Sequence, residues 1–489
     1  MRSLDARPLL LLALAACSSP ATKASAPPNA DSAIARVTMG LRTGIAIKGD
    51  PVATFSLAER MAHYKVPGVS IAVVDSGRIV WARGYGLKES GTTDSVTATT
   101  IFQAASISKP VAATGMLRLV EEGRLALDTP VNAYLKSWTL PDNAFTAKEK
   151  VTLRRIVSHS AGLTVHGFPG YAATDPVPTV PQVLDGARPA NTAPVRVDTF
   201  PGAISRYSGG GITIEQLAMT DVTGEAFPAL LKRLVLDPIG MTNSGYDQPL
   251  AGPRIAQAAA GYRPDGTIIQ GRWHTYPELA AAGLWTTPTD LLKWAMEIAA
   301  ARDGQSTKVL SRKMATEMLT SQKEAFGLGP ALGGKGKGFN FGHGGANEGY
   351  RAQVTYFPEL GRGAAVMTNS DNGSALAQEI LFAIAKEYQW VDYGPREIAP
   401  IALDAAALDA LTGTYATDTP EKIRLSLTRE GTTLYVDEPK YVPRTEVRLL
   451  GATKAIALET GMEFTFLTDA KGTVTGIDLP PMKLTRAKK

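Results

Sequence analysis

The feature that most constrains this chain is a serine and a lysine three residues apart at the start of a long apolar helix. The stretch Phe102-Gln103-Ala104-Ala105-Ser106-Ile107-Ser108-Lys109-Pro110 leads directly into the apolar segment 111–120. Positions i and i+3 share a face of a helix, so the Lys109 amine can reach the Ser106 hydroxyl. An amine whose pKa is lowered by burial can take the proton of a serine hydroxyl and make it nucleophilic. An N-cap serine beside a solvated lysine gives the same pattern. Motifs elsewhere in the chain are therefore needed to distinguish a nucleophile from a structural serine.

The composition is that of a soluble globular protein, and the chain is long enough for two or more domains. At 489 residues, with 44% hydrophobic and 20% charged residues, the chain can bury a large core. Its net charge of +5 comes from 51 basic and 46 acidic residues that are scattered along the sequence. Nucleic-acid binding usually needs clustered basic stripes, so we expect no nucleic-acid partner.

Residues 1–17 predict a lipoprotein signal peptide. Two arginines precede the apolar run Leu9 to Ala16, which is far shorter than the ~20 residues needed to span a bilayer. The run ends in Leu14-Ala15-Ala16-Cys17, which resembles the bacterial lipobox, and Cys17 is the only cysteine of the chain. We expect a lipid anchor on Cys17 at the periplasmic side of a bacterial cell envelope, followed by a flexible tether over residues 18–35. An ordinary signal peptide with a coincidental cysteine is the alternative.

The middle of the chain alternates strand and helix patterns. Two β-rich runs, 69–74 and 79–86, surround a Gly-containing turn and predict a hairpin. Helical spacing predicts helices over 212–222 and 226–236, and a later helix is expected to begin with Thr289 as its N-cap. This mixture favours a domain in which helices pack against a sheet.

Past Pro395 the pattern changes to short alternating runs. A short helix is expected over 403–411, and runs such as 423–427, 433–436 and 463–466 alternate apolar and polar residues. We expect residues 400–489 to form a small antiparallel β-domain that is barrel-like. Docking and stability are its favoured roles, and a lid or substrate-shaping module is the alternative.

Five motifs occur in a fixed order along the chain. They are Ser106-Ile107-Ser108-Lys109, Leu127-Asp128-Thr129-Pro130, His159-Ser160-Ala161-Gly162-Leu163, Tyr207-Ser208-Gly209 and His343-Gly344-Gly345. Together they resemble the serine β-lactamase-related hydrolases, which include class C β-lactamases, DD-peptidases, D-aminopeptidases and related esterases. The resemblance covers residues 36–395 and implies an α/β (α+β) fold: a β-lactamase/transpeptidase-like antiparallel sheet flanked by helices, with a helical subregion. The run Leu411-Thr412-Gly413-Thr414-Tyr415 resembles the start of the lipocalin-like domain that follows many of these hydrolases.

The resemblance implies roles for four side chains. Ser106 is the nucleophile, while Lys109 and Tyr207 move protons, and we expect the lysine charge to ease ionisation of the phenol. His159 is expected to order the motif loops from behind the site. The His and Cys spacings suggest no metal site, and no cofactor is expected.

The third motif implies a substrate-binding strand. His343-Gly344-Gly345 stands where the family has Lys-Thr-Gly, and glycines on an edge strand let a substrate backbone approach closely. The resemblance implies that the backbone amides of Ser106 and Ala346 form the oxyanion hole. His343 is counted with the catalytic residues, and a structural histidine is the alternative.

Substrate preference is inferred from Gly209. Many relatives carry an asparagine there, which hydrogen-bonds the acylamido group of a penicillin or peptide, and glycine cannot make this bond. A neutral His343 also offers a substrate carboxylate less charge than lysine does. We therefore expect small-ester hydrolysis through an acyl-enzyme first, D-amino-acid peptide or amide hydrolysis second, and efficient β-lactam hydrolysis third. Asn347 is an alternative source of the missing donor.

A protein of another class is also compatible with these motifs. It would be a sensor or binding protein that is acylated by β-lactams or cell-wall fragments and hardly turns over. Every motif residue needed for proton transfer is present, which favours the enzyme. Burst kinetics with p-nitrophenyl acetate distinguish the enzyme from the sensor. A sensor releases one equivalent of nitrophenol and then shows no steady turnover.

Overall fold

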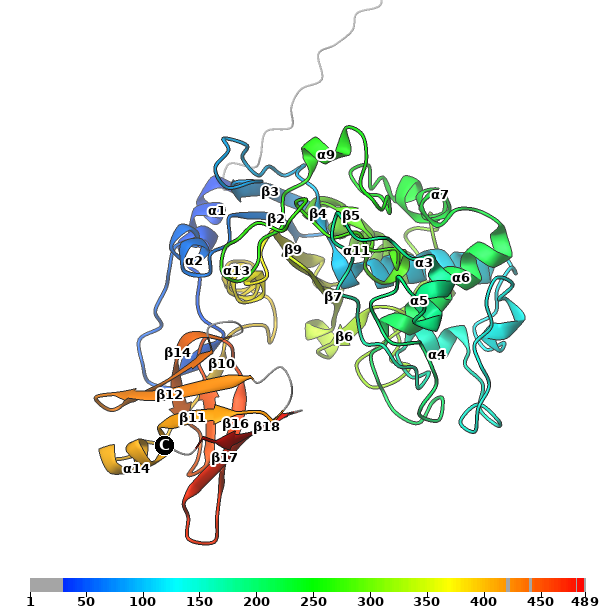
Figure 1. Cartoon of the computed structure of the whole chain (residues 1–489). Helices are drawn as coiled ribbons and strands as arrows, with labels where there is room; N and C mark the ends of the chain where they lie inside the picture. Colours follow the sequence, from blue (N-terminus) through cyan, green and yellow to red (C-terminus); the bar gives the residue numbers. More distant parts are fainter. Residues whose placement is uncertain (1–29, 419–422, 439–441, 481, 488–489) are drawn as a thin grey trace, which may run out of the picture.

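A computed structural model describes residues 30–418, 423–438, 442–480 and 482–487 of the chain. They form an α/β body, in which helices cover both faces of a six-stranded sheet, and a closed β-barrel at the C-terminal end (Figure 1). The expected lipidation site Cys17 lies outside the described residues. Within them, no helix is long and apolar enough to cross a membrane.

Helix α1 (Ala30–Thr38) shows that the predicted tether boundary at residue 35 is wrong. The helix packs against α13 (Gly373–Glu387) and buries Ala33 and Val37. Three of the residues 30–35 are alanines, and alanine has the highest helix propensity of all residues. Residues 30–35 therefore belong to the folded body.

The six-stranded sheet is antiparallel throughout, as the resemblance implied. Its strands, in spatial order, are β3 (Arg78–Gly86), β2 (Gly68–Asp75), β9 (Arg362–Thr368), β8 (Tyr350–Phe357), β7 (Asn340–Asn347) and β6 (Ala331–Gly333). The predicted hairpin is confirmed as β2 and β3. Its two-residue turn has positive φ at Ser76 and Gly77, which matches the right-handed twist of the strands.

The two faces of the sheet belong to two different cores. Along β2, Ile71 and Val73 pack with α13, whereas Ala72 and Val74 face the larger core on the other side. Helix α11 (Pro288–Arg302) covers that second face. Burial on both faces explains why the strand is apolar along nearly its whole length.

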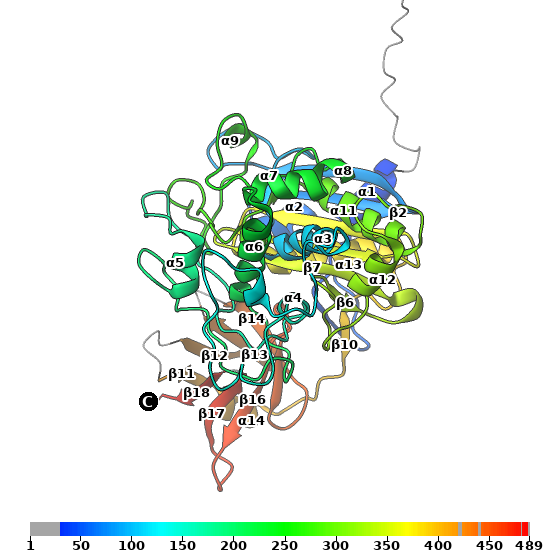
Figure 2. The same cartoon turned by 90° about the vertical axis from the view of Figure 1, so that its right-hand side faces the viewer.

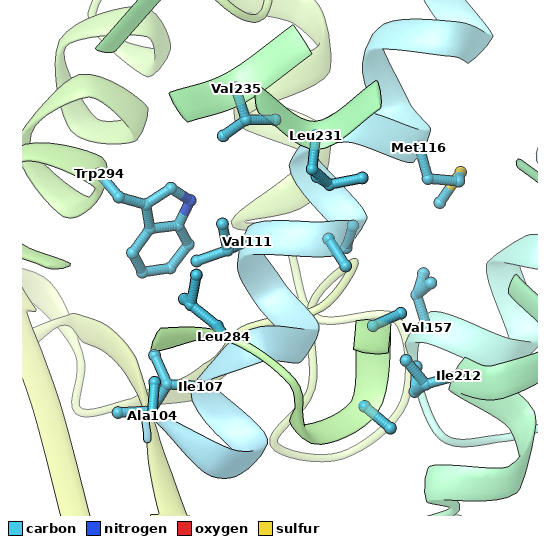
Figure 3. Packing of buried hydrophobic residues seen from close by; sticks show 14 of the residues in the cluster. Ala104, Ile107, Val111, Met116, Val157, Ile212, Leu231, Val235, Leu284 and Trp294 are labelled. Carbon is cyan, nitrogen blue, oxygen red and sulfur yellow. The ribbon is translucent and has the colours of Figure 1, made fainter. Parts of the chain in front are cut away.

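Helix α3 (Ser108–Glu121) runs through the middle of the larger core. Figure 3 shows Val111 on this helix packed among Leu231, Val235 and Trp294, which come from neighbouring helices. A Cβ on Gly115 would lie 2.9 Å from the Leu231 side chain, so the glycine permits this close packing. A helix that is buried all round holds its N-terminal end in a fixed place.

Most of the remaining helices lie around α3 and α11, and Figure 2 shows several of them beside α3. They are α4 (Leu153–Val157), α5 (Val180–Asp185), α6 (Gly209–Thr223), α7 (Phe227–Leu231), the π-helical segment Lys232–Leu236, α8 (Asp237–Ile239), α9 (Arg254–Gln257), α10 (Leu279–Ala282) and α12 (Arg312–Met318). Helix α2 (Leu57–His63) packs with α13 at the other side of the sheet. Smaller elements are the 3-10 turns Ala105–Ile107, Val131–Ala133 and Gly336–Gly338 and the paired strands β4 (Phe102–Gln103) and β5 (Trp285–Thr286).

The predicted start of α11 at Thr289 is off by two residues. Thr287 is the N-cap, and its hydroxyl accepts a hydrogen bond from the Asp290 amide at 3.2 Å. Pro288 follows at the first helical position, where its missing N–H has no helical partner to lose.

The C-terminal strands close into an eight-stranded antiparallel barrel, which confirms the predicted β-domain. After α14 (Ala405–Leu411), the strands are β11 (Gly413–Ala416), β12 (Arg424–Glu430), β13 (Thr433–Glu438), β14 (Val442–Leu449), β15 (Lys454–Ala457), β16 (Glu463–Thr468), β17 (Val474–Leu479) and β18 (Met482–Arg486). Two further strands, β1 (Ile45–Ile47) and β10 (Arg396–Ile398), pair in parallel where the two parts of the chain meet. There Ile45 and Ile398 pack against Ile456 of the barrel.

Candidate active site

Ser106 lies in the 3-10 turn that connects β4 to α3. The residue before it, Ala105, has φ of +49°, which is unfavourable for a residue with a side chain and marks a strained turn. Ser108 supports this turn, because its buried hydroxyl donates to the Ala105 carbonyl at 2.5 Å and accepts from the Leu284 amide at 3.0 Å. The structure thus places Ser108 in a supporting position and leaves Ser106 half-buried at the surface of the site.

The Lys109 amine contacts the Ser106 hydroxyl directly. Its Nζ donates to Ser106 Oγ at 2.8 Å and to the Ala281 carbonyl of α10 at 2.8 Å. Burial lowers the pKa of Lys109 to about 7, while the charge of Glu215 acts in the opposite direction. Half of the amines are then neutral near pH 7, and a neutral amine can accept the serine proton.

Tyr207 lies directly before Ser208, the N-cap of α6, whose hydroxyl accepts from the Gly211 amide at 2.9 Å. The Lys109 Nζ is 5.0 Å from the centre of the Tyr207 ring. Burial raises the pKa of Tyr207, although a hydrogen bond with the Ser106 hydroxyl acts the other way. The expectation that the lysine charge eases ionisation of the phenol is therefore wrong for the free protein, because desolvation of the phenolate is the larger effect.

His343 lies on β7 and faces Tyr207, with 3.5 Å between its Nε2 and the phenol oxygen. Its Nδ1 lies 2.5 Å from the Gly344 carbonyl, which can only accept, so Nδ1 carries the proton and Nε2 presents a lone pair. Burial and the nearby Lys109 lower the pKa of His343 to about 4. The imidazole is therefore neutral at pH 7.

The glycines of β7 let the strand approach the nucleophile turn. A Cβ on Gly345 would collide with the Ala104 carbonyl, whereas one on Gly344 would meet only the flexible end of Gln353. Strand β6 pairs only with residues 340–342, so the edge of β7 from His343 onward is not covered by β6. Ala346, the predicted oxyanion donor, follows on this exposed part of the strand.

The side chain of Asn347 points into the protein rather than toward a substrate. It is 4% exposed, and its amide nitrogen donates to Gln103 Oε1 at 2.7 Å and to the Ala282 carbonyl at 3.1 Å. These bonds tie β7 to β4 and α10. They also leave Asn347 without a free donor for the acylamido group of a substrate.

His159 holds the segment around Tyr207. Its Nδ1 accepts from the Ser208 amide at 3.2 Å, and its carbonyl accepts from the Arg206 amide at 2.7 Å. Its ring also packs against the Tyr207 ring and, edge-on, against Phe326. Burial keeps the pKa of His159 well below its usual value, so the ring is neutral.

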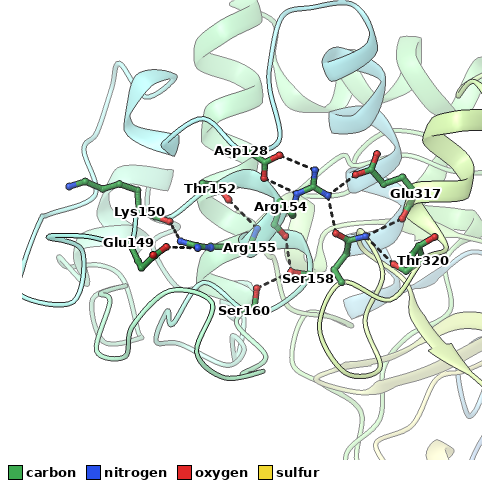
Figure 4. Close-up of polar contacts among 11 residues, drawn as sticks. Asp128, Glu149, Lys150, Thr152, Arg154, Arg155, Ser158, Ser160, Glu317 and Thr320 are labelled. Carbon is green, nitrogen blue, oxygen red and sulfur yellow. Dashed lines mark hydrogen bonds and ion pairs between the residues drawn. The ribbon is translucent and has the colours of Figure 1, made fainter.

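The loop that carries His159 is anchored by ion pairs (Figure 4). Arg154 of α4 binds the Asp128 carboxylate through two nitrogens and also donates to Glu317 of α12 at 2.7 Å. At the end of the helix, the Ser158 hydroxyl donates to the Arg154 carbonyl at 2.8 Å. Asp128 of the second sequence motif is thereby joined to helix α4, which leads directly into the third motif at His159.

Gly209 lies at the first turn of α6, where there is little room for a side chain. A Cβ there would lie 3.1 Å from the His166 carbonyl and 3.1 Å from the Phe168 ring. The Gly209 amide donates to this same carbonyl at 3.0 Å, and the His166 ring is 4.9 Å from the Tyr207 ring. Residues 166–168 thus form a wall beside Tyr207 and Gly209.

Several of these residues were missed from the sequence. Phe168 lies in an irregular loop and has no motif, and the Ala281 carbonyl has no side-chain signal at all. Glu215 was overlooked because an acidic residue in a helix is expected on the surface, yet its side chain is fully buried.

A family model described as Beta-lactamase matches residues 56–389. The chain belongs to the beta-lactamase family. It is 28% identical over 258 residues to the unguisins hydrolase ungD of Aspergillus violaceofuscus, covering 48% of this chain and 42% of that relative, which is less than half of the relative's length. It is 25% identical over 331 residues to esterase EstB of Burkholderia gladioli, covering 61% of this chain and 79% of EstB.

A solved structure shares the fold of this beta-lactamase family member. The D-amino acid amidase from Ochrobactrum anthropi complexed with L-phenylalanine amide matches with a TM-score of 0.56 and 23% identity, over 68% of this chain and 96% of the amidase. Family membership places the chain among serine hydrolases whose relatives are named esterases, D-aminopeptidases and penicillin-binding proteins.

Two hollows lie outside the cluster of motif residues. One of about 530 Å³ lies between α2, α13 and the barrel, and one of about 790 Å³ lies beside α2 and the ends of β2 and β3. Neither is lined by Ser106, Lys109 or Tyr207, so chemistry rather than volume identifies the candidate active site. Among the described residues, no group of three or more His, Cys, Asp or Glu side chains could hold a metal ion.

Proposed function

We propose that the protein hydrolyses small carboxylic esters through an acyl-enzyme on Ser106. The observation that carries the proposal is the 2.8 Å hydrogen bond between the Lys109 amine and the Ser106 hydroxyl, because it joins a nucleophile to a base that is neutral in part at pH 7.

In the first half of the reaction, neutral Lys109 takes the Ser106 proton while Oγ attacks the ester carbonyl carbon. The carbonyl oxygen becomes an oxyanion, which the amide N–H groups of Ser106 and Ala346 hold. Two such donors can stabilise the transition state by ~3 to 4 kcal/mol each. As the bond to the leaving group breaks, the Tyr207 phenol donates its proton to the departing alkoxide, and the ammonium of Lys109 restores the phenol proton.

In the second half, a water molecule attacks the acyl carbon. Lys109 accepts a proton from this water, a second oxyanion forms in the same hole, and Ser106 leaves with a proton returned from the ammonium. The carboxylic acid product is released, and both residues regain their starting protonation.

Three features of the site support esters over β-lactams and peptides. Gly209 offers no side-chain amide, Asn347 is occupied within the protein, and His343 is neutral near pH 7. A missing hydrogen bond to a buried polar substrate group weakens transition-state binding by ~1 to 3 kcal/mol. Ester substrates lack an acylamido group, so they are unaffected.

A substrate panel tests this proposal. We expect kcat/KM to be highest for p-nitrophenyl butyrate, lower for a D-alanyl peptide and lowest for nitrocefin, with Ser106→Ala as the blank. D-amino-acid amide hydrolysis is the second candidate, since the fold is shared with a D-amino acid amidase. Nitrocefin as the best substrate would contradict the ester ranking, and one equivalent of nitrophenol without steady turnover would identify the sensor instead.

We also propose that the protein is tethered to a bacterial envelope through a lipid on Cys17, on its periplasmic side. The support is the sequence Leu14-Ala15-Ala16-Cys17, which resembles a lipobox. A Cys17→Ala variant should appear in the soluble fraction or stay unprocessed. Equal membrane association of the variant with normal processing would exclude the anchor.

A further inference from the structure

We propose that Asn347 and Gln103 are positioning residues for the oxyanion hole, because the hydrogen bond between their side chains sets the spacing of the two backbone amides that hold the oxyanion. The inference rests on the proposed function, since Ser106 and Ala346 supply these amides in that reaction. Asn347 and Gln103 are both buried, so they act through the backbone that carries each donor and do not touch the substrate.

The Ala346 amide lies on the free side of β7. The pairing of Asn347 with Tyr350 leaves a two-residue turn between β7 and β8, and such a turn closes the ladder on a hydrogen-bonded pair. Hydrogen-bonded pairs then recur at every second residue of β7, so the Ala346 N–H points away from β8. Strand β6 pairs only with residues 340–342 and does not cover this amide.

The contact between β7 and the nucleophile turn is made by backbone. A Cβ on Gly345 would lie 2.1 Å from the Ala104 carbonyl oxygen and 3.3 Å from the Ala105 side chain. The glycine permits this close approach, but it offers no side chain that would fix the strand at one position. The spacing between strand and turn is therefore set by a neighbouring residue.

Asn347 makes the contact that fixes this spacing. It lies two residues beyond Gly345 and therefore on the same face of β7, toward the nucleophile turn. Its amide nitrogen donates to Gln103 Oε1 at 2.7 Å and to the Ala282 carbonyl of α10 at 3.1 Å. Asn347 directly follows one oxyanion donor, and Gln103 precedes the other by three residues, so this bond joins the two halves of the oxyanion hole.

Gln103 is a fixed point against which Asn347 holds β7. Its side-chain nitrogen donates to the His274 carbonyl at 2.8 Å, which orients the carboxamide and leaves Oε1 to accept from Asn347. Its backbone pairs with Trp285 in the ladder of β4 and β5. Bonds to three other segments therefore keep Gln103 in place, and a bond to it determines where the strand lies.

Asn347 also has a path to the base. The Ala282 carbonyl, which accepts from Asn347, comes directly after that of Ala281, which accepts from the Lys109 amine. The pH dependence separates the two effects. Asn347 and Gln103 do not titrate, so a misplaced oxyanion donor lowers the rate by the same factor at every pH, whereas a displaced Lys109 moves the acidic limb.

The test measures kcat and KM for p-nitrophenyl butyrate between about pH 5 and 9. Asn347→Leu keeps the number of side-chain atoms but removes the donor. We expect kcat to fall by about 10- to 100-fold at every pH, because one oxyanion donor is no longer aligned in the transition state. KM should change by less than about threefold, since the hole acts on the transition state more than on the bound ester.

Gln103→Met removes the acceptor of the same bond and should lower kcat in the same way. The two changes break one interaction, so their effects should not multiply. We expect the double variant Gln103→Met/Asn347→Leu to lose no more than about threefold beyond the more impaired single variant. If Asn347→Leu does not fold, Gln103→Met gives the same comparison from the other side of the bond.

Asn369 is a matched control elsewhere in the fold. It is a buried asparagine whose amide nitrogen donates to the Leu87 and Lys88 carbonyls at 3.4 and 3.2 Å, and whose oxygen accepts from the Gly68 amide at 2.8 Å. Asn369→Leu should lower the unfolding free energy, as Asn347→Leu does, but leave kcat within about threefold of the wild type. A merely structural role would give both variants this small effect on kcat.

Three results would overturn the proposal. They are a loss of kcat in Asn347→Leu no larger than in Asn369→Leu, a shifted acidic limb, and losses that multiply in the double variant. If the wild type does not hydrolyse the ester, the rate at which a fluorophosphonate probe labels Ser106 replaces kcat, with Ser106→Ala as the blank. Slower labelling of Asn347→Leu than of Asn369→Leu then supports the positioning role while the ester proposal fails, and absence of labelling in the wild type would overturn both.

Discussion

The imidazole of His159 lies 4.1 Å from the ring of Tyr207, with the two planes tilted by 32°. The same residue accepts one backbone hydrogen bond from Arg206 and one from Ser208, so it holds the chain on both sides of Tyr207. A neutral imidazole with its Nδ1 as an acceptor is suited to this purpose, and the low pKa of His159 keeps it in that form. The phenol is thus placed by its neighbours in the chain as well as by its own packing.

We expect His159→Ala to lower kcat for p-nitrophenyl butyrate by about 10- to 100-fold, with a smaller change in KM, because Tyr207 loses its alignment with the leaving group. His166→Ala is the control, since its ring also approaches Tyr207, at 4.9 Å, but is exposed. Steady-state kinetics on both folded variants make the comparison. A larger loss in His166→Ala than in His159→Ala would contradict this role.

Removal of the hydroxyl should lower activity at Ser106 and stability at Ser108. Ser106→Ala should lose at least about 1000-fold in kcat with little change in stability, because the covalent route disappears. Ser108→Ala should lose about 1 to 3 kcal/mol of unfolding free energy, because two buried backbone groups lose their partner. Urea unfolding and ester hydrolysis measure the two effects, and strong activity in Ser106→Ala would remove Ser106 as the nucleophile.

Activity should rise with pH through about 7. Burial lowers the pKa of Lys109 to about 7, so the neutral amine is scarce below that pH and predominates above it. Lys109→Arg separates a base from a fixed charge, because arginine stays protonated at any working pH. We expect this variant to lose at least about 100-fold in kcat/KM at pH 8. Retained activity would show that Lys109 acts only through its charge and that another group takes the serine proton.

A buried ion pair within the α/β body lies beside its contact with the barrel. Arg60 binds Glu379 through two nitrogens at 2.7 and 2.8 Å, and the Tyr64 hydroxyl donates to the same carboxylate at 2.8 Å. Glu459, beside the barrel strand β15, reaches Arg60 at 3.4 Å and His63 at 2.9 Å. Glu459 therefore joins the barrel to α2, whereas the Arg60–Glu379 pair joins α2 to α13 within the α/β body.

We expect Arg60→Ala to destabilise the protein by about 3 to 5 kcal/mol, because it leaves the Glu379 carboxylate buried without its partner. Glu459→Gln removes only the partly exposed contacts and should change the unfolding free energy by less than about 1 kcal/mol. Urea unfolding of both variants tests this difference. Equal effects would mean that the buried pair contributes no more to stability than the partly exposed contacts of Glu459.

The features that could be predicted from the sequence depend on neighbours in the chain. The three-residue spacing of Ser106 and Lys109 and the alternation in the barrel strands are local patterns, and local geometry converts them directly into contacts. The hairpin of β2 and β3 was recognisable for the same reason. Each of these needs only the repeat of one element and the turn that ends it.

The features that could not be predicted depend on burial by distant parts of the chain. The pKa of Tyr207 rises because the phenol is enclosed, and no motif reports that. Glu215 has an ordinary helical context, and only the packing of other elements around α6 buries its carboxyl group. The wall of His166 and Phe168 belongs to a loop whose path is set by hydrogen bonds to the first turn of α6.

The wall beside Gly209 leads to the last prediction. A side chain at position 209 would meet the His166 carbonyl and the Phe168 ring at 3.1 Å, which is closer than most Cβ contacts in proteins. Gly209→Asn alone should therefore crowd the first turn of α6. We expect a loss of about 1 to 3 kcal/mol in unfolding free energy and no gain with nitrocefin.

Gly209→Asn combined with Phe168→Ala should behave differently, because removal of the ring gives the new amide room beside Tyr207. We expect the double variant to raise the ratio of kcat/KM for nitrocefin over p-nitrophenyl butyrate by about tenfold or more relative to Phe168→Ala alone, since one hydrogen bond to the acylamido group becomes available. Phe168→Ala is the matched control for the enlarged pocket. An unchanged ratio in a folded double variant would show that Gly209 and its wall do not determine the preference, and the ester ranking would then lose its main support.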